Sequence, residues 1–261
     1  MKRTLVTLDL ATFPPCFHDF LRDAPIYDSS CSPEAKVYYI DKQEGFFLKT
    51  APANSLRLEV DLTRFFHERG LAPQVIDYVQ VDQDWLLTRR ASGEDCTHAM
   101  YTEDPKRLSE TIAQLLRSLH ESDVSGCPVP NHTENYCATV RNNYLTGNYS
   151  KTDLTEDWGF HSPEEAWKIV EEVAPCLQSD TLLHGDYCLP NIMLDNWKFS
   201  SFIDLDHGGI GDRHIDLFWG TWSLAFNLRT DAYGDRFLDA YGRDRINPDI
   251  LKAITAFEAF G

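Results

Sequence analysis

The sequence predicts an α+β fold with two lobes, a small β-rich N-lobe and a larger helical C-lobe. Before about residue 90, short runs of β-branched and aromatic residues are separated by turn residues, as in strands. Beyond that point apolar residues recur three and four positions apart, as on one face of a helix. We therefore expect an N-lobe at residues 1–90, a C-lobe at residues 91–261 and a connector at about residues 88–93.

The N-lobe elements follow from short apolar runs. In order, we expect strands at residues 36–40 and 45–50, a helix at residues 55–69, and strands at residues 75–80 and 85–88. Only four polar residues, 41–44, separate the first two strands, which predicts a hairpin. Gly70 directly follows the helix, where a C-terminal cap is expected.

The C-lobe elements are helices with recognisable starts. Asp104 before Pro105 is a cap followed by proline in the first turn, and Ser162 with Glu165 three residues later is a capping box. Further helices are expected at residues 212–228, 231–241 and 248–260.

The charge of the chain limits its partners. Twenty-four Lys and Arg against 41 Asp and Glu give a net charge of −17, which repels the phosphate backbone of nucleic acids. The sequence therefore predicts no nucleic-acid partner, and a cationic small molecule fits better.

Localisation and redox state follow from what the sequence lacks. No apolar run reaches about 18 residues and no signal peptide is recognisable, so we expect a soluble cytoplasmic protein without membrane contact. The seven cysteines are scattered and odd in number, which predicts reduced thiols. Whether the chain is a monomer or a homodimer stays open.

Polar residues are concentrated in the otherwise apolar segment 182–206. Residues 192–203 predict a hairpin with its turn near Asn196, which would bring Asn191 and Asp204 together at its open end. A carbonyl oxygen and carboxylates at one position can hold Mg²⁺ beside a polyphosphate. Asp186 precedes Asn191 by five residues, the spacing of the protein-kinase catalytic loop. We therefore expect Asp186 to be the catalytic base and Asn191 and Asp204 to bind the metal, with His184 structural.

A kinase also needs a strand lysine for the nucleotide phosphates and a helix glutamate that holds it. Lys49, near the end of the second strand, and Glu59, in the first helix, are the candidates. No glycine-rich phosphate-binding motif is present, so Ser32 and its neighbours before the first strand are expected to contact phosphate.

The chain resembles the aminoglycoside 3'-phosphotransferases, which have a protein-kinase-like bilobal fold. The likeness rests on Phe-Leu-Lys-Thr at 47–50, His-Gly-Asp at 184–186 with Cys-Leu-Pro-Asn at 188–191, Phe-Ile-Asp at 202–204, Gly-Asp-Arg at 211–213 with Asp216, and Glu-Ala-Phe at 258–260. The resemblance implies transfer of the γ-phosphate of ATP or GTP, with Mg²⁺, to a hydroxyl (3'-OH expected) of an aminoglycoside, which inactivates the antibiotic.

The resemblance also implies roles for residues that spacing alone does not assign. Adenine would pair with the connector backbone at Arg89 and Ala91. The acceptor amines would be held by Glu156, Asp157 and Glu258.

Some residues depart from the family pattern. Where members carry acidic and arginine contacts, the helix after Asp216 reads Trp219, Trp222, Phe226 and Asn227, and we expect these aromatics to form core or groove wall. Asp206-His207 also stands where members commonly show Gly-Arg. One alternative is therefore a kinase of the same fold acting on another small alcohol, sugar or antibiotic; a non-catalytic nucleotide-binding pseudokinase is the remote third.

Overall fold

The computed structural model describes residues 3–31, 35–150, 152, 154 and 158–261. Its contacts divide the chain into two compact units. The first unit comprises Met1–Cys96 and Pro190–Asp206, and the second comprises Thr97–Leu189 and His207–Gly261.

This division differs from the lobes expected from the sequence at residues 91–96 and 190–206. Both segments were assigned to the C-lobe, yet their contacts lie in the first unit. Backbone hydrogen bonds are the physical cause, because β7 (Glu94–Asp95) pairs with β9 (Ile192–Asp195) and the Phe202 N–H donates to the Leu71 carbonyl at 2.8 Å.

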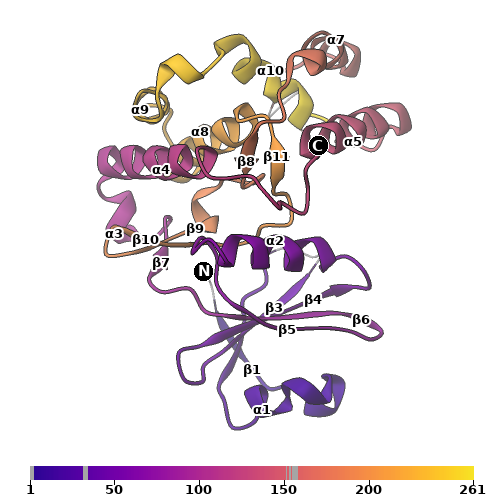
Figure 1. Cartoon of the computed structure of the whole chain (residues 1–261), viewed down its shortest axis with the longest axis vertical. Coiled ribbons are helices and arrows are strands. Elements are labelled where there is room, and N and C mark those ends of the chain that lie inside the picture. Colours follow the sequence, from indigo (N-terminus) through magenta and orange to yellow (C-terminus); the bar gives the residue numbers. More distant parts are fainter. Residues whose placement is uncertain (1–2, 32–34, 151, 153, 155–157) are drawn as a thin grey trace. The chain divides into compact units, whose positions relative to one another are not determined.

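A six-stranded antiparallel sheet forms most of the first unit, with strand order β1-β2-β3-β4-β6-β5 (Figure 1). Its strands are β1 (Thr4–Val6), β2 (Ile26–Asp28), β3 (Lys36–Ile40), β4 (Phe46–Pro52), β5 (Val75–Gln80) and β6 (Gln83–Arg89). The four longer strands match the predicted runs. The two three-residue strands were not predicted, because three residues are too few for an alternating pattern to stand out.

The two faces of this sheet are covered by different segments. On one face, α2 (Arg57–His67) contributes Leu56 at its N-cap and Val60, which pack with Ala51 and Leu86 of the sheet. On the other face, short helical turns and α1 (His18–Leu21) bury aromatic and aliphatic side chains (Figure 1). That core comprises Phe13, Phe17, Leu21, Ile26, Ile40, Phe46, Leu48, Trp85 and Leu87. Buried side chains therefore pack against both faces of β4, the strand that carries Lys49.

A second, three-stranded sheet contains the predicted hairpin. Its strand order is β10-β9-β7, with β10 at Lys198–Phe202. Asn196 and Trp197 form the turn, and both have positive φ, +50° and +67°, as a two-residue type I′ turn requires. At the open end the Ile203 N–H donates to the Asn191 carbonyl at 3.0 Å, so the hairpin brings residues 191 and 204 together as expected.

The second unit is mostly helical. Its helices include α3 (Ala99–Thr102), α4 (Pro105–His120), α5 (His132–Thr146), α7 (Pro163–Val173), α8 (His214–Leu228), α9 (Gly234–Tyr241) and α10 (Pro248–Glu258), with a two-stranded ribbon of β8 (Thr181–Leu183) and β11 (Gly209–Gly211). The predicted helices agree with α4, α7, α8, α9 and α10. No prediction covered α5, which buries only Thr133 and Val140 and so lacks a long apolar stripe.

The predicted caps explain where two of these helices begin. The Asp104 side chain accepts from the Arg107 N–H, and the Ser162 hydroxyl accepts from the Glu165 N–H. In a capping box the Glu165 carboxylate would accept from the N–H of the cap residue, Ser162. Here it accepts from the His161 N–H, one residue earlier.

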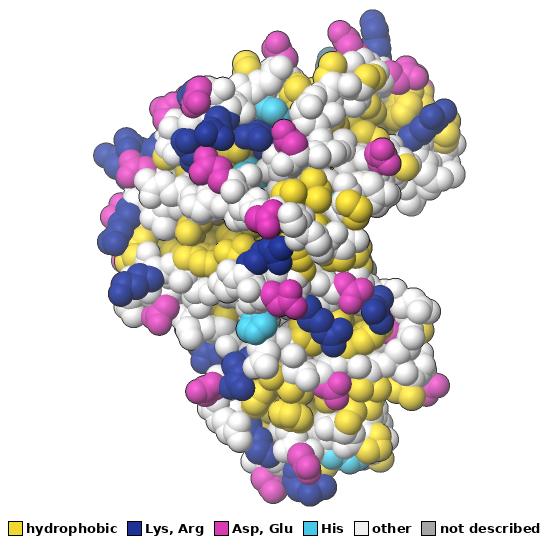
Figure 2. All heavy atoms as spheres, viewed as in Figure 1, with side chains coloured by type: hydrophobic (Ala, Val, Ile, Leu, Met, Phe, Trp, Pro, Cys, Tyr) yellow, Lys and Arg dark blue, Asp and Glu magenta, His cyan; other side chains and the backbone are white. Residues whose placement is uncertain are grey.

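The surface of the second unit carries charges of both signs. Arg236 of α9 pairs with Glu110 of α4, and Arg243, just after α9, pairs with Asp235 and Asp239. Figure 2 shows dark blue and magenta side chains intermingled in this region. Among the described helices, none is long and apolar enough to cross a membrane. All seven cysteines lie in the described residues, and none of them forms a disulfide there.

Candidate active site

Lys49 is the centre of a charged cluster in the first unit. It lies on β4, opposite Val37 of β3 and Leu86 of β6. Its Nζ is 2.8 Å from Glu59 Oε2 and 2.7 Å from Asp204 Oδ1. The expected ion pair between the strand lysine and the helix glutamate is present, and the hairpin aspartate is its second partner.

Burial and charge set the protonation of this cluster. Burial alone would lower the pKa of Lys49, but the carboxylates of Glu59 and Asp204 outweigh it and raise that pKa, so the amine stays cationic. Burial raises the pKa of Glu59 to about 7 against the opposing attraction of Lys49. The Asp204 side chain is 49% exposed, compared with 8% for Glu59, so Asp204 is the partner that solvent and a ligand can reach.

A cavity of about 280 Å³ opens beside this cluster within the first unit. Its apolar lining includes Val37, Phe47, Leu86 and Met193, which suit the faces of a flat ring. Its polar lining includes Lys49, Glu59, Thr88, Asn191 and Asp204. Apolar walls with charged groups at one end are the arrangement that a nucleotide needs.

The connector forms another part of the lining, including Arg89 and Ala91. The N–H groups of Arg89 and Arg90 donate to the carbonyls of Gln74 and Gly45, at 2.9 and 3.0 Å, which fixes the connector backbone. Gly93 has φ of +81°, and a Cβ there would lie 2.0 Å from the Leu194 carbonyl oxygen. Only glycine therefore allows the connector to pass this close to β9.

Oxygen donors converge where the sequence predicted a metal site. Glu59, Asp204 and Asp206 each offer a carboxylate oxygen, and these atoms lie within 4.8 Å of one another. Asn191 is 7% exposed and lines the same cavity as Asp204. Oxygen ligands of this kind fit Mg²⁺. Asp204 has φ of +60°, a conformation that a non-glycine residue adopts at a cost.

Asp206 was not among the predicted site residues. The signal available in the sequence was its position two residues after Asp204, where the family pattern has glycine. Its charge also raises the pKa of Glu59.

The predicted catalytic loop lies in the second unit, where β8 leads into His184, Gly185 and Asp186. The fully buried Asp216 carboxylate accepts hydrogen bonds from the His184 and Gly185 N–H groups, both at 2.8 Å. Gly185 has φ of +87°, and a Cβ there would lie 1.7 Å from the His207 carbonyl oxygen. The loop backbone is therefore held in one conformation immediately before Asp186.

A buried network supports Asp216 from behind. His120 Nε2 lies 3.1 Å from Asp216 Oδ2, and His120 Nδ1 lies 2.8 Å from the Tyr241 hydroxyl. Burial lowers the pKa of His120, so its imidazole is neutral near pH 7. Within the catalytic loop, the Asp186 N–H donates to His184 Nδ1 at 3.3 Å, in keeping with a structural role for His184.

Of the expected acceptor residues, Glu258 is described. It lies at the end of α10, and Tyr136 donates its hydroxyl to Glu258 Oε1 at 2.7 Å. Burial raises the pKa of Glu258 to about 7, against hydrogen bonds from Tyr136 and the Trp219 indole. Its charge is therefore sensitive to pH near neutrality. Ser32, Glu156 and Asp157 lie outside the described residues.

The fold and the ion pair of Lys49 define the class as kinase-like phosphotransferases. The family model described as "Phosphotransferase enzyme family" matches residues 33–254. A curated relative named "Probable aminoglycoside 3'-phosphotransferase", from Lactococcus lactis, is 48% identical over 97% of both chains. An aminoglycoside 3'-phosphotransferase of Niallia circulans is 28% identical over 86% of this chain and 87% of its own. The chain belongs to the aminoglycoside 3'-phosphotransferase family.

Solved structures show the same fold at low sequence identity. An aminoglycoside-3'-phosphotransferase of type VIII has a TM-score of 0.74 at 21% identity, covering 99% of this chain and 94% of its own. An aminoglycoside phosphotransferase from Streptomyces rimosus, in complex with ADP and streptomycin, has a TM-score of 0.70 at 20% identity, covering 97% and 99%. The expected bilobal kinase-like α+β fold is thereby confirmed.

Proposed function

We propose that this protein transfers the γ-phosphate of ATP or GTP to a hydroxyl of an aminoglycoside, the 3'-OH expected, and so inactivates the antibiotic. The observation that carries the proposal is Lys49, held between Glu59 and Asp204 at the charged end of the cavity. The relatives that are named for this reaction, one of them 48% identical over nearly the whole chain, support the choice of acceptor.

The donor nucleotide is bound by the first unit in this proposal. Its base lies between Val37, Phe47 and Leu86 and pairs with the backbone of Arg89 and Ala91. The cationic amine of Lys49 contacts the α- and β-phosphates, and Glu59 keeps that amine in position. Ser32 adds a phosphate contact from the segment before β3.

Asn191 and Asp204 would hold Mg²⁺ through their oxygen atoms, and Asp206 adds a third candidate carboxylate. When bound, the ion would neutralise charge on the phosphates during transfer. Lys49 is the cationic partner of Asp204 in the structure.

The acceptor is bound and activated by the second unit. Asp186 accepts the proton of the attacking hydroxyl and orients its oxygen toward the γ-phosphate. The hydrogen bonds from His184 and Gly185 to Asp216 keep the loop before Asp186 fixed. Glu258, with Glu156 and Asp157, binds the protonated amines of the acceptor. The net charge of −17 also attracts such a cation to the protein. We assign this activity to the cytoplasm, where ATP is available.

A second candidate is a kinase of the same fold that acts on another small alcohol, sugar or antibiotic. It is favoured by the aromatic residues Trp222 and Phe226, which stand where charged contacts were expected and are exposed. The pseudokinase alternative is disfavoured because binding alone would not require Asp186.

A panel assay separates these candidates. Purified protein is incubated with ATP and Mg²⁺ and with kanamycin, 3'-deoxykanamycin, choline, simple sugars or a macrolide, and products are identified by mass spectrometry. Phosphorylation of kanamycin but not of its 3'-deoxy analogue is the expected result. Turnover confined to choline, sugars or the macrolide would replace the proposal with the second candidate, and no acceptor-dependent turnover would indicate the pseudokinase.

A further inference from the structure

Two of the aromatic side chains on α8, which the sequence predicts to form core or groove wall, are exposed. Trp222 is 36% exposed and Phe226 is 66% exposed. Their rings are stacked, with centroids 5.0 Å apart and an interplanar angle of 11°. A folded chain normally buries most of the apolar area of its large side chains. Two stacked aromatic rings that stay exposed therefore indicate a candidate binding surface.

This pair continues a line of aromatic rings that reaches the acceptor carboxylate. Trp219, three residues before Trp222 on the same face of α8, meets it edge to face at 5.4 Å. Trp219 also packs against the cluster that contains Phe257, the residue before Glu258, and its indole lowers the pKa of Glu258 as a hydrogen-bond donor. Trp219, Trp222 and Phe226, which we call the aromatic wall, are therefore joined to a carboxylate at one end and open to solvent at the other.

The chemistry of the aromatic wall specifies what it can bind. The face of an aromatic ring attracts an ammonium group and packs against the C–H groups of a saturated ring. The Glu258 carboxylate, whose pKa lies near 7, adds a site for one protonated amine beside these rings. A saturated ring that bears protonated amines satisfies both parts at once, and the net charge of −17 favours such a cation.

We propose that the aromatic wall is the surface of the acceptor site on which an amino-sugar ring rests, with one of its amines at Glu258. The inference rests on the proposed function and adds to it the residues that select the acceptor. The choice of acceptor substrate then depends on whether the substrate has a ring with an apolar face, as well as on its number of positive charges. Trp222 and Phe226 bind the substrate in this role and take no part in proton or phosphate transfer.

Steady-state kinetics of Trp222→Ala and Phe226→Ala test this role. For each variant we expect a roughly tenfold rise in the KM for kanamycin, the scale of one aromatic packing contact, with the KM for ATP and the kcat nearly unchanged. Trp222→Phe keeps a ring and should recover most of the loss. Leu145→Ala, at a 68% exposed position on α5, is the matched control and should leave both KM values unchanged.

A second probe separates ring stacking from charge alone. Spermine carries several amines but no ring, so its inhibition constant should be the same in wild type and in Trp222→Ala. Titration with kanamycin without nucleotide should change the tryptophan fluorescence of the wild type and much less that of Trp222→Phe.

Several results would overturn the inference. One is an unchanged kanamycin KM in both alanine variants, and another is an equal loss of spermine affinity. A shift from dimer to monomer in sedimentation of Trp222→Ala would show that a second copy of the chain covers the wall. If the wild type phosphorylates no aminoglycoside, the proposed function fails instead, a result that the wild-type assay alone reveals.

Discussion

Replacement of Asp216 by asparagine is the sharpest test of how the fold holds the catalytic loop. The Asp216 carboxylate is fully buried and accepts from the His184 N–H, the Gly185 N–H and His120 Nε2. Asparagine keeps one carbonyl oxygen, but its NH₂ group would face a backbone N–H donor. At least one hydrogen bond is then lost, and the others lose their charge.

The size of the effect follows from those contacts. A hydrogen bond to a charged group contributes about 1.5–3 kcal/mol, so the loss of one in Asp216→Asn should cost at least about that much. That is a large part of the roughly 5–15 kcal/mol by which native proteins are stable. Because the loop before Asp186 loses its support, kcat should fall by more than about tenfold, which corresponds to about 1.4 kcal/mol.

The pH of the measurement matters because the carboxylate must be ionised. Burial alone would raise the pKa of Asp216, but the hydrogen bonds from His120 and the loop backbone outweigh it and lower that pKa below 3.8. The stabilisation is therefore complete above pH 3.8 and is lost as the pH falls through the lower pKa of the folded state. Urea unfolding at pH 7 compares the variants with this carboxylate ionised.

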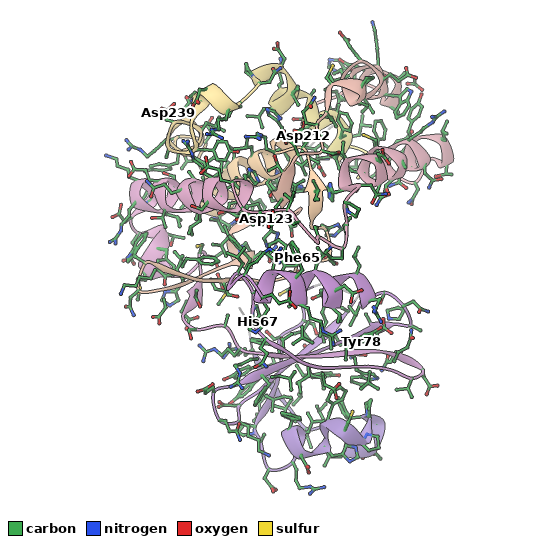
Figure 3. All side chains as sticks on the ribbon, in the orientation of Figure 1. Phe65, His67, Tyr78, Asp123, Asp212 and Asp239 are labelled. Carbon is green, nitrogen blue, oxygen red and sulfur yellow. The ribbon has the colours of Figure 1, made fainter. Side chains whose placement is uncertain are left out.

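Asp212 supplies a matched control. It lies in the helical second unit (Figure 3) and is 1% exposed. Its carboxylate accepts from the Gln178 N–H at 2.7 Å, the His214 N–H at 2.9 Å and His214 Nδ1 at 2.6 Å. Asp212→Asn should therefore lose similar stability but hold its kcat, since these partners lie outside the catalytic loop. Equal kcat values in the two variants, or a stability loss below about 1 kcal/mol in Asp216→Asn, would refute the reasoning.

The other predictions concern the chemistry itself. Asp204→Ala should abolish turnover while the circular dichroism spectrum stays that of the wild type; activity near the wild-type value would remove this residue from the metal site. Asp186→Asn should lower kcat by roughly 10²-fold or more with little change in ATP affinity, measured by calorimetry, and a large loss of ATP binding would show a different role. The KM for kanamycin should fall as pH rises through about 7, where Glu258 ionises, because a protonated carboxyl does not attract an amine. Glu258→Gln should flatten that pH profile between pH 6 and 8, and an unaltered profile would exclude Glu258 as the titrating group.

The sequence alone identified the groups that local patterns encode. Lys49 stands in an apolar strand run, and the Asn196 turn sets the hairpin that brings residues 191 and 204 together. Turn chemistry and apolar periodicity act over a few residues, so they can be recognised without the fold. For the same reason the helix starts at Asp104 and Ser162 were predictable.

Tertiary structure alone decided which distant groups meet. The hairpin at residues 192–203 follows several helices of the second unit in the chain. Its contacts nevertheless lie in the first unit, because β9 pairs with β7. Asp206 lies in the carboxylate cluster with Glu59, and His120 and Tyr241 form a hydrogen-bonded network with Asp216. These residues are far apart in the sequence, and no local pattern predicts that they meet. Whether an aromatic residue on α8 is buried depends on what packs against each side of that helix. The sequence therefore determined the chemical groups, and packing determined that Trp222 and Phe226 stay exposed.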